Sequence, residues 1–320
     1  MTNLRSTVHR RQAVQVATAA LLVIISLMGV HHLNESDRRW TDMVNEGSHD
    51  RIEGAGLGSF MFSDSEVIRD NPVRVWYIAP QTDLATAQIL FVMPGAERDA
   101  ECYRSDWEPL VKERNVLVLV PEFPEDVYPV TSYNLGNLVD SDGSARPQEE
   151  WTFAVIEALF DQVRRDVQSE AEHYNMFGHS AGAQFVHRFV EFMHPHRLGA
   201  AVAANAGWYT VPDGSDDFPY GLDGSQLSVE DLGPAFASEL IILLGADDID
   251  AEDDLLRHDE QSDAQGLNRL ERGLNFYLAA RDTAAAESMP FQWELRVVSG
   301  IDHDHTQMAK AAAEFLIDGP

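Results

Sequence analysis

The chain has 320 residues, of which 53 are Asp or Glu and 23 are Lys or Arg, so its formal net charge is −30. This charge excludes general binding to nucleic acid phosphates, which needs a basic face that displaces counterions. The single cysteine, Cys102, excludes an internal disulfide and a thiolate-based metal site.

The first 30 residues have the character of a targeting segment. Three arginines precede an apolar run over residues 13–30, which is close to the ~18 residues that a membrane-spanning helix needs. We therefore predict a signal segment or a membrane anchor over residues 1–30, and the lack of a small-residue cleavage site at its end favours an uncleaved anchor. The catalytic domain is then exported or anchored outside the cytoplasm. Residues 31–58 are polar and predict a linker, which leaves residues 59–320 for one folded domain.

Strand-like and helix-like segments alternate along this domain. Short apolar or alternating runs that end at turn residues predict strands, and apolar residues three or four apart predict helices. The predicted strands are residues 59–62, 73–78, 88–92, 116–120, 174–177, 200–204, 240–244 and 291–298. The predicted helices are residues 101–114, 153–167, 184–192, 267–278 and 308–316. The alternation predicts an α/β fold with a mostly parallel central sheet and helices on both faces, preceded by one N-terminal hydrophobic helix.

A motif Gly-His-Ser-Ala-Gly occupies residues 178–182, between a predicted strand and a predicted helix. The two glycines leave room for a strained turn that holds the hydroxyl of Ser180 above the sheet. A strand, a turn with serine and a helix together form a nucleophile elbow. The motif is short, so its meaning depends on partners elsewhere in the chain.

The expected partners occur in the order that such a fold requires. Serine needs a base to activate it, and the base needs an acid to orient it. The acid and the histidine should each follow a later strand. Asp248 follows the seventh predicted strand and is the predicted acid, with Asp247 as the alternative. His303 follows the last strand and is the predicted base, with His305 as the alternative.

Backbone donors and pocket residues complete the predicted site. Acyl transfer needs N–H groups that stabilise an oxyanion, and Ala181, directly after the serine, supplies the first. Ala96, in the turn after the third predicted strand, supplies the second. Trp208 and Tyr209 follow a strand end, so they either line the substrate pocket or pack in the core.

Motifs for metal or cofactor binding are missing. The acidic residues 247–254 lack the spacing of a calcium-binding loop. We find no zinc motif and no glycine-rich phosphate loop in the sequence. We therefore expect neither a metal nor a cofactor.

With these residues in place, the chain resembles the α/β-hydrolase superfamily, in particular its small esterase and poly(3-hydroxybutyrate) depolymerase-like branch. The resemblance covers most of residues 73–317. It rests on residues 92–96, 178–182, 245–248 and 300–303. The resemblance implies an α/β-hydrolase fold and a triad of Ser180, Asp248 and His303.

The sequence thus predicts a serine hydrolase that cleaves a carboxylic ester through an acyl-enzyme intermediate. We expect a small-molecule or lipid-like ester as substrate, contact with a membrane through the N-terminal segment, and no nucleic acid partner. A serine peptidase of the same fold is one alternative. A catalytically inactive hydrolase fold that only binds is the other.

Overall fold

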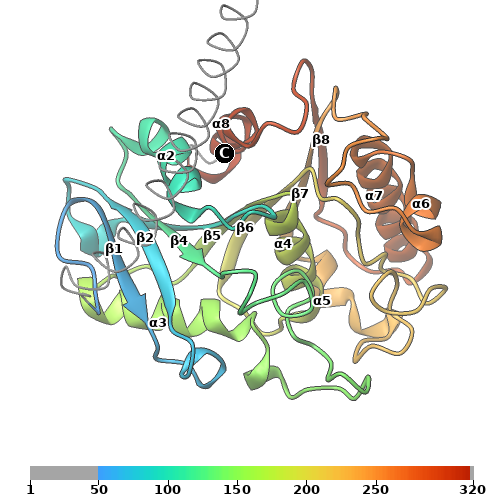
Figure 1. Ribbon diagram of the computed structural model, residues 1–320, viewed down its shortest axis with the longest axis horizontal. Coiled ribbons are helices and arrows are strands. Elements are labelled where there is room, and N and C mark those ends of the chain that lie inside the picture. The colour runs from blue at the N-terminus through green and yellow to red at the C-terminus, as the bar shows by residue number, and fades with distance from the viewer. Residues whose placement is uncertain (1–49, 318–320) are drawn as a thin grey trace, which may run out of the picture. The chain divides into compact units, whose positions relative to one another are not determined.

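The computed structural model describes residues 50–317 (Figure 1). The predicted signal segment or membrane anchor, which is also the predicted N-terminal hydrophobic helix, and most of the predicted linker lie outside these residues. Among residues 50–317, every helix is too short or too polar to cross a membrane.

Eight strands form one sheet in the order β1-β2-β4-β3-β5-β6-β7-β8. The strands are β1 Gly56–Phe62, β2 Val73–Ala79, β3 Gln88–Met93, β4 Val116–Glu122, β5 Tyr174–His179, β6 Leu198–Ala204, β7 Glu239–Gly245 and β8 Glu294–Val298. All neighbours from β4 to β8 pair in parallel, whereas β2 pairs antiparallel with both β1 and β4. The prediction of a mostly parallel sheet is confirmed.

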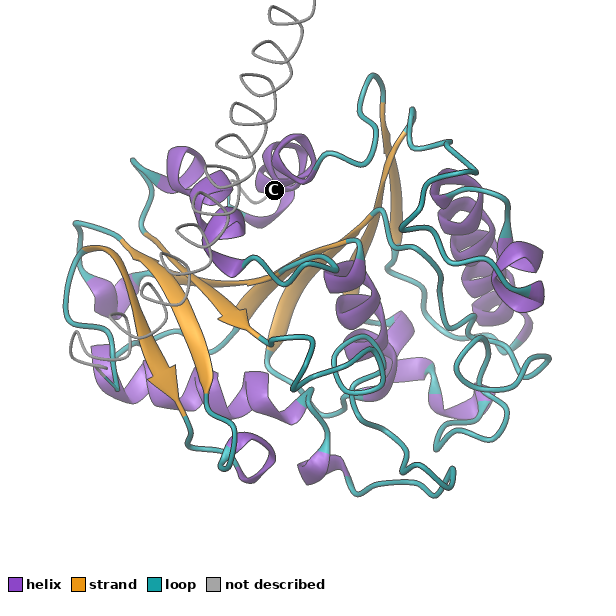
Figure 2. Cartoon of the chain, viewed as in Figure 1, coloured by secondary structure: helices purple, strands orange, loops and turns teal. Residues whose placement is uncertain are grey.

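Helices cover both faces of this sheet (Figures 1 and 2). They are α2 Ala100–Val111, α3 Ala154–Val167, α4 Ala181–Phe192, α5 Gly233–Phe236, α6 Glu260–Gln265, α7 Arg269–Ala286 and α8 His305–Leu316. Helices α2 and α8 pack side by side on one face, while α3, α4 and α5 lie on the other. The short helices α5 and α6 are absent from the sequence prediction because each spans too few residues to show a periodic pattern.

Several predicted boundaries differ from the structure, among them the start of the domain and the end of strand β4. The domain starts before residue 59, since β1 begins at Gly56 and Ile52 is already part of the core. Strand β4 continues through Pro121, where the sequence pattern ends it. Strand β3 pairs with β4 only as far as Leu119, so Pro121 lies where one side of β4 has no neighbouring strand. Proline, which has no N–H to donate, is tolerated at such positions.

Helix α7 is confirmed, but only two of its four predicted leucines, Leu270 and Leu274, pack against the core. Leu267 precedes the helix and is 57% exposed, and Leu278 is 41% exposed. The helix also buries Gly273 and Phe276. A Cβ on Gly273 would lie 2.4 Å from the side chain of Leu244 in β7, so the smallest residue marks the closest approach of helix and sheet.

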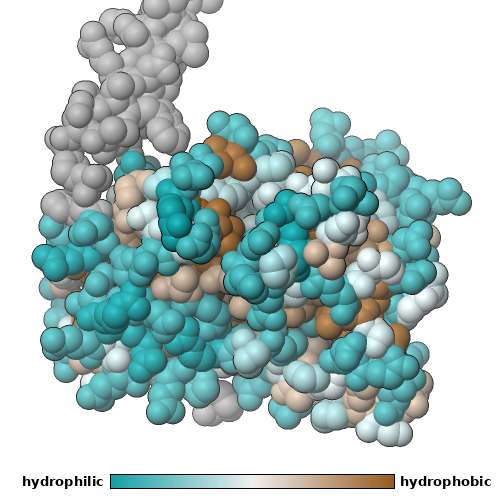
Figure 3. Space-filling view, turned by 90° about the horizontal axis from the view of Figure 1, so that it is seen from below, coloured by the Kyte–Doolittle hydropathy of each residue, from teal (hydrophilic) through white to brown (hydrophobic). Residues whose placement is uncertain are grey.

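The outer surface is largely polar. Figure 3 shows hydrophilic side chains over most of the face that is seen from below, with smaller apolar areas between them. This distribution agrees with a chain in which Asp and Glu occur in nearly every segment.

Candidate active site

Ser180 lies at the sharp turn between β5 and α4, at the carboxyl edge of the sheet. Its backbone has φ 55° and ψ −115°, a conformation that a residue with a side chain adopts only at a cost of about 1–3 kcal/mol. The N–H of Ser180 donates a hydrogen bond to the carbonyl of Ala204, at 2.9 Å, and holds the turn against the end of β6. The strained turn between a strand and a helix has the geometry of the predicted nucleophile elbow.

The two glycines of the motif are required by close packing. A Cβ on Gly182 would lie 1.9 Å from the carbonyl oxygen of Met93, at the end of β3. A Cβ on Gly178 would lie 2.2 Å from the carbonyl oxygen of Gly182. Helix α4 therefore starts directly against β3 and β5, and Ser180 stands above both strands.

His303 and Asp248 meet at the same sheet edge. The Nδ1 of His303 lies 2.8 Å from Oδ2 of Asp248, whose side chain is 3% exposed. Because an ionised carboxylate only accepts, Nδ1 carries the proton and Nε2 is free to accept another. Asp247, the alternative acid, is exposed instead.

The His303 ring also lies next to the elbow. Its centroid is 4.6 Å from that of His179, the residue before Ser180. No hydrogen bond between described residues joins the Ser180 hydroxyl to His303, and in free enzymes such bonds are often long until substrate binds. The structure thus brings Ser180, Asp248 and His303 to one edge of the sheet.

Asn205 is a buried connector that the sequence analysis missed. Its Oδ1 accepts from the N–H of Gly245 at 2.8 Å, and its Nδ2 donates to the carbonyl of Asp302 at 2.9 Å. The side chain therefore ties the ends of β6 and β7 to the loop that carries His303. A polar residue directly after an apolar strand is the signal that points to it.

Arg269, which the sequence analysis also missed, forms a buried ion pair with Asp248. Its guanidinium is 1% exposed, and Nη1 lies 3.3 Å from Oδ1 of Asp248 and 2.9 Å from Oδ2 of Asp253. A buried cation between two carboxylates balances their charge where water cannot. No local pattern marks this arginine, which lies 21 residues after Asp248.

His179 is a neutral group beside Ser180. It is 2% exposed, and its Nδ1 lies 3.0 Å from the hydroxyl of Tyr103. Burial, together with the neighbouring histidines, lowers the pKa of His179 well below its usual value. The elbow thus adds no positive charge next to Ser180.

His305, the alternative base, forms a hydrogen bond with Asp106 and not with Asp248. Its Nδ1 lies 2.5 Å from Oδ2 of Asp106 in α2, and its ring stacks on Tyr103 with centroids 4.8 Å apart. The contact fastens the start of α8 to α2, two residues after His303. We therefore describe His305 as part of the support of the site.

The contact between His305 and Asp106 makes the free energy of unfolding depend on pH. The hydrogen bond that His305 donates to Asp106 raises the pKa of His305 in the folded protein, so the stabilisation is full below the unfolded pKa of about 6.5 and fades as pH rises through the folded value. We expect Asp106→Asn to lower the melting temperature more at about pH 5.5 than at about pH 9. Thermal unfolding at both pH values tests this, with Thr306→Val as a control that removes an uncharged contact to the same carboxylate. An equal loss at both pH values would contradict the assignment.

Trp208 and Tyr209 pack in the core. Tyr209 is fully buried and stacks on Phe276, with ring centroids 4.3 Å apart. Trp208 is 3% exposed, with the buried guanidinium of Arg188 4.2 Å from its ring centroid. Of the two predicted possibilities, core packing therefore describes both side chains.

The predicted oxyanion donors flank Ser180. Ala181 is the first residue of α4, where backbone N–H groups lack helical partners. Ala96 lies in the exposed turn after β3, and its N–H makes no hydrogen bond to another described group. The turn is close to Ser180, because a Cβ on Gly95 would lie 3.6 Å from the Cβ of Ser180.

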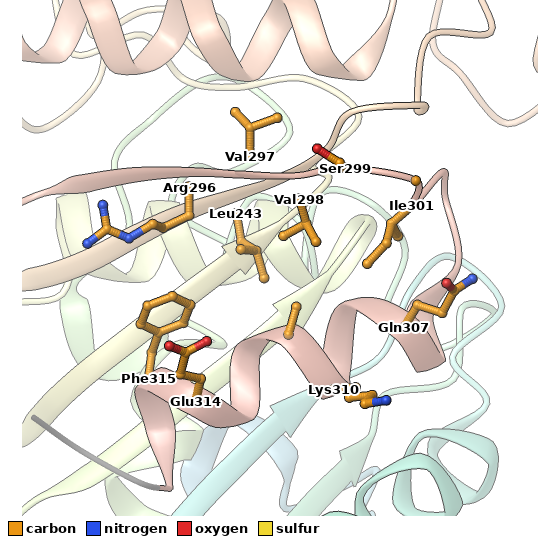
Figure 4. Close-up of a pocket in the computed structure, with 12 residues that line it drawn as sticks. Leu243, Arg296, Val297, Val298, Ser299, Ile301, Gln307, Lys310, Glu314 and Phe315 are labelled. Carbon is orange, nitrogen blue, oxygen red and sulfur yellow. The ribbon is translucent and has the colours of Figure 1, made fainter.

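A separate groove of about 650 Å³ runs between β8 and α8 (Figure 4). Leu243, Val298 and Phe315 point into it, whereas Val297 points away. Ser180 and Asp248 do not line it, and its wall ends at Ile301, two residues before His303. Within residues 50–317 no group of three or more His, Cys, Asp or Glu side chains is arranged to hold a metal ion.

Comparison with known proteins gives strong matches among solved structures only, since no family model and no curated protein matches the chain. Poly(aspartic acid) hydrolase-1 from Sphingomonas sp. KT-1 is 41% identical, with a TM-score of 0.79 over 82% of this chain and 99% of that chain. LpqC, a poly(3-hydroxybutyrate) depolymerase from Bordetella parapertussis, is 32% identical, with a TM-score of 0.79 over 83% and 90% of the two chains. An S-formylglutathione hydrolase from Agrobacterium tumefaciens, at 16% identity and a TM-score of 0.52 over 81% and 95%, shares the fold alone.

Proposed function

We propose a function for this chain that starts from its family. The chain is a member of the α/β-hydrolase superfamily, in its esterase-like branch. It is a hydrolase that acts on ester bonds. We propose that Ser180, Asp248 and His303 carry out this reaction on a small-molecule or lipid-like ester.

In the proposed reaction, Oγ of Ser180 attacks the ester carbonyl while Nε2 of His303 takes the hydroxyl proton. Asp248 holds His303 in the required tautomer and stabilises its charged form. The N–H groups of Ala181 and Ala96 donate to the oxyanion of the tetrahedral intermediate. His303 then protonates the leaving alcohol, and water releases the acid from the acyl-enzyme by the same steps.

The observation that carries the proposal is the buried contact between His303 and Asp248 beside the strained Ser180 turn. A series of p-nitrophenyl esters with increasing acyl chain length tests it. We expect hydrolysis with a clear chain-length preference and stoichiometric labelling of Ser180 by a fluorophosphonate. A folded protein that neither reacts with the probe nor hydrolyses any ester is instead an inactive fold that only binds.

A second candidate, hydrolysis of an amide polymer, is favoured by the 41% identity to a poly(aspartic acid) hydrolase. The same residues could cleave an amide if His303 protonates the leaving nitrogen. Long-range electrostatics oppose a polyanionic substrate, because a net charge of −30 repels it. Turnover of poly(aspartic acid) that rises with ionic strength would support this candidate, whereas ester turnover alone supports the first.

A further inference from the structure

The oxyanion loop, which we define as Pro94, Gly95 and Ala96, directly follows β3. Pro94 and Gly95 are buried, while Ala96 is exposed with its N–H free of acceptors among the described residues. Because a free amide in a turn can rotate with its peptide plane, something must hold that plane if the N–H is to donate reliably. Residues outside the triad supply such contacts.

Arg98 forms hydrogen bonds with this loop. Its Nη1 donates to the carbonyl oxygen of Gly95 at 3.1 Å and to that of Ala96 at 3.0 Å. The backbone N–H of Arg98 donates to the Gly95 carbonyl as well, at 3.1 Å. The Gly95 carbonyl therefore receives two hydrogen bonds from one residue, and the next carbonyl receives a third.

These bonds determine where the Ala96 N–H points. The peptide between Gly95 and Ala96 is trans, so the carbonyl of one and the N–H of the other point in opposite directions. With the Gly95 carbonyl drawn toward Arg98, the Ala96 N–H is directed away from the guanidinium and stays without a partner among the described residues. Gly95 itself lies against Ser180, since only 3.6 Å would separate a Cβ on Gly95 from the Cβ of the serine.

Arg98 is in turn held rigidly. It is 5% exposed and has φ 56°, and its Nη2 donates to Oδ1 of Asn134 at 3.1 Å. Its guanidinium carbon lies 3.9 Å from the ring centroid of Tyr133. The hydroxyl of Tyr133 donates to the carbonyl of Pro94 at 2.8 Å, so all three carbonyls of the oxyanion loop are anchored.

We propose that Arg98 is a positioning residue for the oxyanion hole, an inference that rests on the proposed function of Ser180. It orients the Ala96 N–H through the carbonyls of the oxyanion loop. This effect acts on the tetrahedral intermediate more than on the bound ester, because only the intermediate carries the negative charge. Loss of Arg98 should therefore lower kcat and leave KM nearly unchanged.

The test compares Arg98→Met with Arg104→Met in the full chain, on a p-nitrophenyl ester. Arg104 is a matched control, because it is 8% exposed and lies over Trp76, without a contact to the oxyanion loop. For Arg98→Met we expect kcat to fall about 10²–10³-fold at an unchanged KM. A trifluoromethyl ketone, which forms a serine-bound oxyanion, should bind more weakly by the same factor as the fall in kcat/KM. We expect Arg104→Met to stay near wild type in both measurements.

The outcomes separate this inference from the proposed function. If the wild type is active and labelled at Ser180 while folded Arg98→Met keeps its kcat, the role of Arg98 is refuted and the triad stands. A wild type that is folded, inert and unlabelled overturns both. Should Arg98→Met not fold, Arg98→Lys decides, since lysine keeps the charge but cannot hold two carbonyls in the geometry of a guanidinium. A tenfold or greater loss of kcat at constant KM then supports the role, and an unchanged kcat refutes it.

Discussion

We expect Ser180→Ala to abolish ester hydrolysis and to leave the protein folded. The substitution removes only the hydroxyl that attacks the carbonyl, so kcat should fall about 10⁶-fold, to the level that binding and the oxyanion donors alone sustain. Alanine keeps the Cβ and therefore the strain of the backbone at φ 55°. The melting temperature should change by no more than a few degrees, because the Ser180 hydroxyl has no hydrogen-bond partner in the described chain.

The measurement pairs steady-state hydrolysis with labelling by a fluorophosphonate and thermal unfolding. Ser105→Ala, an exposed serine on α2, is the matched control and should match the wild type in all three. Residual turnover of Ser180→Ala within about tenfold of the wild type would place the nucleophile elsewhere. Labelling of Ser180→Ala at a different serine would lead to the same conclusion.

Asp248→Asn should lower kcat by about 10⁴-fold without unfolding the protein. The carboxylate accepts a hydrogen bond from the protonated Nδ1 of His303. In the proposed reaction this leaves Nε2 without a proton, so that it can take the proton of the serine. An asparagine amide can donate to Nδ1 instead, which stabilises the tautomer with a proton on Nε2, and that tautomer cannot act as the base. The buried Arg269 keeps Asp253 as its charged partner, so the change should be tolerated structurally.

Asp247→Asn is the matched control for this experiment. Asp247 precedes Asp248 in the same loop, but it is exposed and makes no side-chain contact with His303. We expect its kcat to lie within about twofold of the wild type, as for a surface substitution away from the site. If Asp247→Asn shows the large loss and Asp248→Asn does not, the assignment of the acid is wrong. Far-ultraviolet circular dichroism of both variants verifies that they are folded.

The elements that the sequence predicts correctly are those with a strong local signal. The apolar run at residues 116–120 predicts a strand buried on both faces, and β4 lies in the middle of the sheet. Phe153, Ile156 and Phe160 recur at helical spacing, and all three are buried along α3 and at its start. The amphipathic pattern carries this information because one side of each element must face the core.

The supports of the site could not be predicted in this way. Arg98, Asn205 and Arg269 are polar residues, and the periodicity of the apolar residues does not show which polar side chains are buried. Each is buried by elements that come from other parts of the chain: Arg98 by the loop with Asn134, and Asn205 by the loop before His303. A buried polar side chain is stable only when distant groups satisfy it, and sequence spacing does not identify those groups.

The sequence by itself determined the α/β alternation, the elbow at Ser180 and the order in which an acid and a histidine follow it. These features depend on local rules of periodicity, turn geometry and chain order. The tertiary structure decided the choice between neighbouring residues, because it turned Asp248 inward to His303 and directed His305 to Asp106. Residues one or two positions apart share the same local pattern, and only the packing of distant strands and helices determines which side chain faces the site.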